Sequence, residues 1–187
     1  MKKKGIKGGV AALIIGSIIF FATGNLGQQE KPNNSGFKNA QLEQAMREVG
    51  WHKYDSWCVY FAKLCWHVAI TNDTVNDLAM KLITGNSQST LANFQHDKSG
   101  WFEVTNYAQP AAIVIWQEIK DSVGMWSGHA GIVIKDTLNG FKTIEGNTNT
   151  NGSSNGYEVA MHYKKYNWHT MNGLRLRGFI RFKVLKP

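Results

Sequence analysis

The sequence predicts an α+β domain in which helices pack against one face of an antiparallel sheet. Between residues 41 and 83, apolar residues recur three and four positions apart, which is the spacing of one helical face. After residue 100 the pattern changes to short segments rich in β-branched and aromatic residues, separated by Gly and Asn, as in strands. Helices followed by strands favour the α+β class, and 187 residues allow one domain of ordinary size.

The N-terminal segment has the composition of a targeting signal. Four lysines lie among the first seven residues: Lys2, Lys3, Lys4 and Lys7. An uncharged apolar run follows, Val10 to Ala22, which has the length of a signal-peptide core and falls short of the ~20 residues of a comfortable membrane span. We therefore expect residues 1–24 to be a signal peptide. The alternative is an uncleaved anchor that attaches the protein to the cytoplasmic membrane through residues 9–23. Either interpretation predicts an exported protein of the cell envelope, the periplasm or the extracellular medium.

The folded domain is expected to span residues 39–187, because residues 25–38 have the Asn, Gln, Gly and Ser content of a flexible linker. Helices are predicted at residues 41–49, ended by Gly50, at 56–66 with Ser56 as N-cap, at 74–83, ended by Gly85, and as a short piece at 90–95.

Strands are predicted at residues 101–105, 112–117, 129–135, 140–144, 157–162 and 177–184, which gives a central sheet of about six strands. The stretch 146–156, rich in Asn, Gly and Ser, is predicted to be a loop.

The charge balance argues against nucleic-acid binding. The formal net charge is +8, from 21 basic and 13 acidic residues. Without the four N-terminal lysines it falls to about +4, and the basic residues beyond residue 30 are scattered. Such a surplus suits an anionic partner such as a cell wall, and no basic stripe or nucleic-acid motif is present.

The two cysteines, Cys58 and Cys65, lie seven residues apart in one predicted helix. Two helical turns separate their Cα atoms by ~10.5 Å, beyond the ~7 Å limit for a disulfide, so both are expected to be free. Cys58 falls in the first helical turn, where free N–H groups and the helix dipole stabilise a thiolate, which makes it a candidate nucleophile. The alternative is a small buried core residue, and Cys65 fits that description.

A thiolate needs a proton partner, and His129 is the candidate among the six histidines. It stands at the entry of a predicted strand between Gly128 and Ala130, small neighbours that let another group approach its ring. A hairpin with the next strand would bring Glu145 or Asn147 beside the ring, where an acceptor would orient the imidazole.

Aromatic residues near the predicted site are candidates for contact with a substrate. All seven tryptophans fall within the predicted domain, and most are expected in the core. Trp57 and Trp126 are close to Cys58 and His129 in sequence, so a substrate groove is their alternative place. Tyr54 is a candidate second donor to an oxyanion, beside the Cys58 backbone N–H.

These motifs resemble the CHAP family, the cysteine, histidine-dependent amidohydrolases and peptidases. The resemblance rests on Ser56-Trp57-Cys58-Val59-Tyr60-Phe61, Gly128-His129-Ala130-Gly131-Ile132-Val133, Ile144-Glu145-Gly146-Asn147-Thr148 and Arg177-Gly178-Phe179-Ile180-Arg181. It covers about residues 40–184 and implies a papain-like α+β fold with amide-bond cleavage in peptidoglycan, by an N-acetylmuramoyl-L-alanine amidase or an endopeptidase. It also implies Cys58 as nucleophile, His129 as base, Glu145 as its orienter and Asn147 as a fourth polar member.

The sequence departs from the family in two places. Many relatives have Gly-Asp before the strand that precedes the histidine, where this chain has Pro110-Ala111-Ala112. The acidic cluster with which some relatives bind calcium is reduced here to Asp55, so no metal and no cofactor are expected. Two other functions stay open: an inactive cell-wall-binding module, and an amidohydrolase that acts on a substrate other than peptidoglycan.

Overall fold

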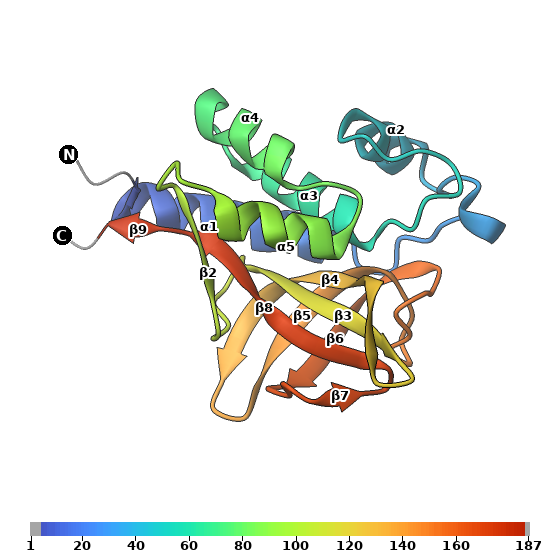
Figure 1. The fold of residues 1–187 in the computed structure, drawn as a ribbon. Coiled ribbons are helices and arrows are strands. Elements are labelled where there is room, and N and C mark those ends of the chain that lie inside the picture. Colours follow the sequence, from blue (N-terminus) through green and yellow to red (C-terminus); the bar gives the residue numbers. More distant parts are fainter. Residues whose placement is uncertain (1–4, 186–187) are drawn as a thin grey trace.

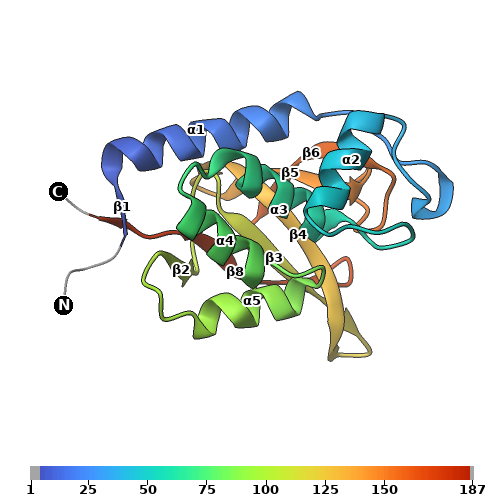
Figure 2. The same cartoon turned by 90° about the horizontal axis from the view of Figure 1, so that it is seen from above.

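The computed structural model describes residues 5–185, and its α+β architecture confirms the class predicted from the sequence. The helices of this part are α1 (Gly8–Gly24), α2 (Ala40–Glu48), α3 (Cys58–Ala69), α4 (Asp73–Leu82) and α5 (Ser87–His96), with a short 3₁₀ helix at Pro32–Asn34. They gather in one layer above the sheet, where α1 and α5 lie on either side of α3 and α4 (Figures 1 and 2).

The central sheet has seven strands and is antiparallel throughout, in agreement with the predicted sheet of about six. Its strands are β2 (Phe102–Thr105), β3 (Ile113–Lys120), β4 (Val123–Thr137), β5 (Gly140–Thr148), β6 (Glu158–Lys165), β7 (Thr170–Met171) and β8 (Leu174–Phe182). They lie in the order β2-β8-β3-β4-β5-β6, with β7 beside β8, and the sheet is strongly curved (Figure 1). Two further strands, β1 (Ile6–Lys7) and β9 (Val184–Leu185), form a separate parallel pair near the chain ends.

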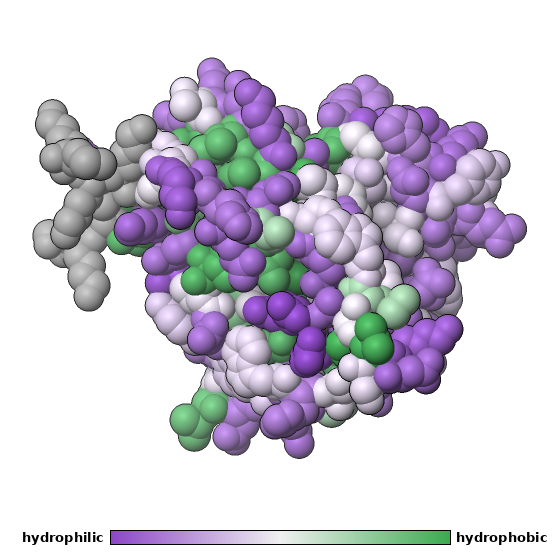
Figure 3. Space-filling model, viewed as in Figure 1, coloured by the Kyte–Doolittle hydropathy of each residue, from purple (hydrophilic) through white to green (hydrophobic). Residues whose placement is uncertain are grey.

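Alternation along the strands divides the buried side chains between the two faces of the sheet. Ile115, Ile132 and Ile144 belong to the larger core that includes the helices. The residues next to them in sequence, such as Val114 and Val133, belong to a smaller core on the other face. Both faces are therefore covered, which fixes the register of the strands that carry the site. On the face seen in Figure 3 the surface is mostly hydrophilic, with apolar surface gathered over the helical layer and its junction with the sheet.

Three of the helices begin at an asparagine cap. The side chains of Asn39, Asn72 and Asn86 accept hydrogen bonds from backbone N–H groups in the first turns of α2, α4 and α5. Helix α3 differs, because it begins at Cys58 after Trp57, whose side chain makes no capping hydrogen bond. The predicted N-cap at Ser56 is thus wrong by one residue. The uncapped first turn leaves backbone N–H groups free around the thiol.

Close contact between α3 and β5 depends on Gly146. A Cβ at this position would lie 2.5 Å from the Trp57 ring and 2.8 Å from Cβ of Phe61. Because a glycine stands here, the start of α3 packs directly on β5, and Cys58 comes to lie next to the strands that carry His129 and Glu145.

Helix α1 packs along α3 with one face buried, and that face consists of Ala11, Ile14, Ile18 and Ala22. Their spacing of three and four places them on one side of the helix. The other side is apolar and exposed, with Leu13 at 74% and Phe20 at 82%. Among residues 5–185 no helix has the length and apolar character needed to cross a membrane. Three of the predicted targeting lysines, Lys2, Lys3 and Lys4, lie outside the described residues.

Residues 25–38, predicted as a linker, lie against the domain in this structure. Gln29 pairs with Glu158 and Glu30 with Phe37 in isolated β-bridges, and the Gly27 N–H donates to the Val159 carbonyl. Phe37 is 1% exposed and packs edge-on against the rings of Trp51 and Trp57.

Candidate active site

Cys58 lies at the first turn of α3 and faces a cleft of about 390 Å³. The cleft is lined by the start of α3, the strands β3 and β4, the loop after β5 and the turn before β8. Cys58 as a residue is 6% exposed and is among the residues that line this cleft, so it lies at the wall of the cleft rather than deep in the core. A small ligand in the cleft would therefore meet the sulfur.

The environment of Cys58 favours its thiolate. Burial alone would raise the pKa of the thiol, but the positive charge of His129 and the backbone N–H groups of Ala130 and Val59 together lower it below its ordinary value of 9.0. The Val59 N–H belongs to the uncapped first turn of α3. The start of the helix thus stabilises the thiolate, as its position in the sequence predicts.

His129 lies on β4 and is oriented by Glu145 on β5. Its Nε2 is 3.0 Å from Glu145 Oε2, and both side chains are 1% exposed or less. The other ring nitrogen, Nδ1, is buried and makes no hydrogen bond of standard geometry within the described part of the chain. Burial would lower the pKa of His129, but the charge of Cys58 and the hydrogen bond and charge of Glu145 raise it to about 9. The ring therefore carries its proton at neutral pH, beside a thiol whose pKa is lowered.

Glu145 is held ionised by three partners. Besides His129, the Thr143 hydroxyl donates to Oε1 at 2.5 Å, and Lys164 Nζ lies 3.3 Å from Oε2. Burial would raise the pKa of this carboxyl, yet these neighbours lower it to about 2. The carboxylate is charged throughout the neutral range and can keep the imidazole in place.

Gly131 makes room for Glu145 beside the histidine. A Cβ on Gly131 would lie 2.6 Å from Glu145 Cγ, well inside van der Waals contact. The sequence predicted such an approach at the small neighbours on either side of His129, Gly128 and Ala130; the space that the Glu145 side chain uses lies at Gly131.

Lys164, Thr143 and Trp116 belong to this site and were not identified from the sequence. Trp116 on β3 is the cross-strand partner of His129, and their rings stack with centroids 5.8 Å apart. Lys164 on β6 lies over the same indole, with its Nζ 5.4 Å from the ring centroid. Thr143 stands two residues before Glu145 on β5, a spacing that places two side chains on one face and was available as a signal. Lys164 gave no such signal, because its approach depends on the register between β5 and β6, in which Lys164 pairs with Phe141.

Asn147, the predicted fourth polar member, lies on the wall of the same cleft as Cys58. It adopts a left-handed backbone conformation, with φ of 55°, at the end of β5. Its side-chain amide donates to Asn155 Oδ1 at 3.3 Å, while its own Oδ1 is buried without a hydrogen-bond partner in the described residues. The structure thus brings Cys58, His129, Glu145 and Asn147 together.

The three predicted substrate-contacting residues do not line the cleft. Trp57 is fully buried, packs against Phe37 and Phe61, and donates its indole N–H to Glu30 at 2.5 Å, so it is a core residue and not part of a groove. Trp126 is 68% exposed and Tyr54 is 72% exposed, and neither is among the residues that line the cleft. Ser56 lines the cleft beside Cys58 instead.

No protein-family model matches this sequence, and no curated protein matches it. Within residues 5–185, no group of three or more His, Cys, Asp or Glu side chains is placed to hold a metal ion. The arrangement offers a thiol that ionises in a cleft, an imidazole that carries a proton, and a carboxylate that fixes the imidazole. These groups suffice for nucleophilic attack on a carbonyl carbon followed by protonation of a leaving group.

Proposed function

We propose that this protein is a cysteine hydrolase that cleaves an amide bond in peptidoglycan, as an N-acetylmuramoyl-L-alanine amidase or an endopeptidase. The observation that carries the proposal is that Cys58, on the wall of the cleft, is backed by the buried pair of His129 and Glu145, with the thiol pKa lowered and the imidazole pKa raised. Two free cysteines occupy one helix, and Cys58 is the one in contact with a base.

The reaction follows from the protonation states of these groups. The Cys58 thiolate attacks the carbonyl carbon of the amide, and protonated His129 gives its proton to the nitrogen as the C–N bond breaks. The amine leaves and a thioester remains on Cys58. Water then attacks the thioester with His129 as base, which releases the acid and restores the thiolate and the imidazolium.

The uncapped start of α3 supplies a place for the developing oxyanion. The Cys58 backbone N–H is one of the first-turn donors that no intrahelical acceptor reaches. Such a donor stabilises a tetrahedral intermediate more than the planar substrate. Ser56 lines the cleft two residues before Cys58, and we expect its hydroxyl to assist in place of the exposed Tyr54.

The assignment of peptidoglycan as substrate is supported by the resemblance to the CHAP family. Its four motifs include Cys58, the Gly128-His129 pair and Glu145-Gly146-Asn147, and the structural roles of Gly146 and of Glu145 agree with their joint presence. The same resemblance supports a papain-like form of the α+β fold. A net charge of about +4 beyond the N-terminal lysines suits an anionic wall.

Export is part of this proposal, since peptidoglycan lies outside the cytoplasmic membrane. The lysines before residue 8 and the apolar run of α1 support a signal peptide or an anchor at the membrane. The hydrolase would then act in the cell envelope or beyond it.

The proposal is tested by incubating purified peptidoglycan with the full chain and identifying the released fragments by mass. We expect new N-terminal amines or new muramic acid carboxyls with the wild type and none with Cys58→Ala, while Cys65→Ala retains the activity. Sedimentation with the wall but no new ends would favour a binding module. Absence of both, with cleavage in a screen of other amides, would indicate another substrate and overturn the assignment to peptidoglycan.

A further inference from the structure

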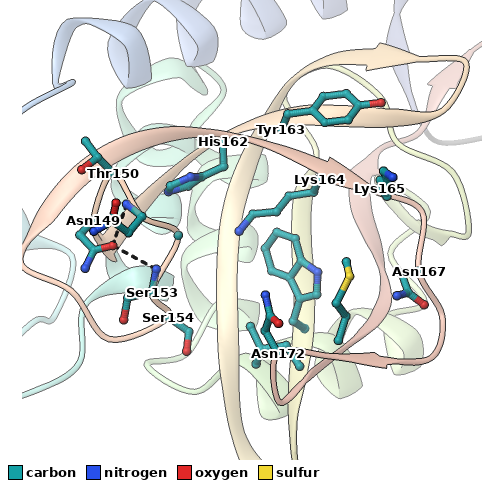
Figure 4. Close-up of a pocket in the computed structure, with 15 residues that line it drawn as sticks. Asn149, Thr150, Ser153, Ser154, His162, Tyr163, Lys164, Lys165, Asn167 and Asn172 are labelled. Carbon is teal, nitrogen blue, oxygen red and sulfur yellow. Dashed lines mark hydrogen bonds between the residues drawn. The ribbon is translucent and has the colours of Figure 1, made fainter.

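A second hollow, larger than the cleft, adjoins the active site. It measures about 760 Å³ against about 390 Å³ for the cleft. Ser154, Asn172 and Leu174 line both, so the two form one continuous depression on the surface. A ligand that reaches Cys58 from this side would extend into the second hollow, whose lining residues are drawn in Figure 4.

The lining of this hollow combines apolar rings and chains with polar side chains, and its charged side chains are Lys164 and Lys165. Figure 4 shows Lys164 between the loop that holds Asn149 and Ser153 and the segment with Asn172. Two lysines and one histidine line the hollow, together with the amides and hydroxyls of Asn and Ser residues, and no Asp or Glu is among its lining residues. Such a surface matches an anionic group surrounded by amides or hydroxyls.

Lys164 connects this hollow to the catalytic residues. Its side chain is 23% exposed, and its Nζ is 3.3 Å from Glu145 Oε2. It also lies over Trp116, whose ring stacks on His129. The charge of Glu145 is shared with His129, so the lysine is not fully neutralised by this carboxylate. An ammonium has three N–H donors, which leaves donors for a ligand in the hollow.

We propose that this hollow binds a carboxylate of the substrate, and that Lys164 is the cation which recognises it. The substrate class is then a peptide or acyl-peptide with a free carboxylate a few bonds from the scissile amide. This inference rests on the proposed hydrolase function and defines which part of the substrate enters beside Cys58. Lys164 acts as a positioning and specificity residue, because one side chain contacts both the bound carboxylate and Glu145.

The loop 149–155 between the hollow and the cleft is built to hold its shape. Asn149 Oδ1 accepts from the backbone N–H groups of Asn151 and Ser153, and the Thr150 N–H donates to Glu158. Thr148 donates to the Ser153 carbonyl at 2.5 Å. These hydrogen bonds engage backbone groups of the loop. Ser154 lies on the wall that both hollows share.

The test measures binding, so that it does not depend on hydrolysis. The full chain carrying Cys58→Ala is titrated with N-acetyl-alanyl-glutamate and with the same peptide whose carboxylates are amidated. We expect the amidated peptide to bind at least about tenfold more weakly, as for loss of a charge-assisted hydrogen bond. Adding Lys164→Gln should weaken binding of the charged peptide to the same degree and leave binding of the amidated peptide unchanged. Lys164→Arg should restore part of the preference.

Lys81→Gln is the matched control, because Lys81 is an exposed lysine on α4, away from the hollow. Equal binding of the two peptides, no binding of either, or an unchanged preference in Lys164→Gln would each overturn the inference. If Lys164→Gln fails to fold, the preference of the Cys58→Ala chain, together with the partial preference expected for Lys164→Arg, decides the case. Wall digestion is scored separately, so a carboxylate preference without wall cleavage refutes the proposed function and not this subsite.

Discussion

The first turn and the middle of helix α3 carry the same residue type in opposite chemical states. Cys58 and Cys65 are both free and buried, and they lie on one helix. The pKa of Cys58 is lowered by His129 and backbone N–H groups, whereas burial without a charged partner raises the pKa of Cys65. Burial opposes ionisation at both positions, so the partner and the helix end decide which thiol reacts.

The largest expected difference between the two is in alkylation. With iodoacetamide at pH 7, Cys58 should be modified at least about 1000-fold faster than Cys65, because each unit of thiol pKa changes the thiolate fraction tenfold. Peptide mass analysis over time measures both rates in one sample. The chain unfolded in urea is the control, in which the two rates should converge. Comparable rates in the folded chain would contradict the assignment of Cys58.

Glu145→Gln should reduce the difference in reactivity between Cys58 and Cys65, because it removes the negative charge that is hydrogen-bonded to His129. Loss of the carboxylate lowers the pKa of the imidazolium, which then stabilises the Cys58 thiolate less well. We expect hydrolysis to fall by about 100-fold or more, and the alkylation profile of Cys58 to move to higher pH. Thr143→Val, which removes only the hydroxyl bond to the same carboxylate, should give a smaller shift in the same direction. An unchanged profile in Glu145→Gln would show that the carboxylate does not act through the ring.

Gly131→Ala tests the geometry rather than the charge. The added Cβ would meet Glu145 Cγ at 2.6 Å and displace the carboxylate from the His129 ring. We expect about a tenfold loss of kcat with little change in KM, because a small misplacement affects the oriented pair and not the binding of substrate. Gly9→Ala on α1, where an added Cβ has no neighbour within 4 Å, should leave the activity as in the wild type.

The smallest expected effect is on stability in acid. The pKa of Glu145 is about 2 in the folded chain against 4.5 ordinarily, so this carboxyl binds its proton less readily when folded. It therefore stabilises the folded state above pH 4.5, and this stabilisation is lost as the pH falls from 4.5 towards 2. Thermal unfolding between pH 5 and pH 3 should show a steeper loss of Tm in the wild type than in Glu145→Gln. Parallel curves for the two proteins would contradict the lowered pKa.

Local patterns predicted the elements well where one face of the element is buried. The helical spacing at 41–49 and 74–83 matches α2 and α4 within one residue at each end. The strands β3 and β4 extend further than predicted, to Lys120 and from Val123, because their outer part is largely exposed and does not alternate between buried apolar and exposed polar residues. The short strands β1, β7 and β9 have two residues each and gave no pattern to detect.

The site was predictable to the extent that its residues carry chemistry of their own. Cys58, His129 and Glu145 have reactive side chains and flanking residues that indicate a site, and the structure brings the three together. Lys164 is one of many lysines in the sequence, and its place beside Glu145 depends on the register of β6 on β5, which local patterns do not reveal. Trp57 was misplaced because its proximity to Cys58 in sequence does not reveal which side of the helix start its ring occupies.

The pairing of β1 with β9 and the packing of α1 on α3 make the N-terminal segment a structural part of the domain. Proteolytic removal of residues 1–24 would take Ile14, Ile18 and Ala22 out of the core and leave β9 without its parallel neighbour. Maturation and folding would then compete for the same stretch of polypeptide. A peptidase that cuts before α1 docks would release a domain with an uncovered apolar surface on α3. If α1 docks first, the peptide bonds between residues 22 and 24 would be protected from the peptidase.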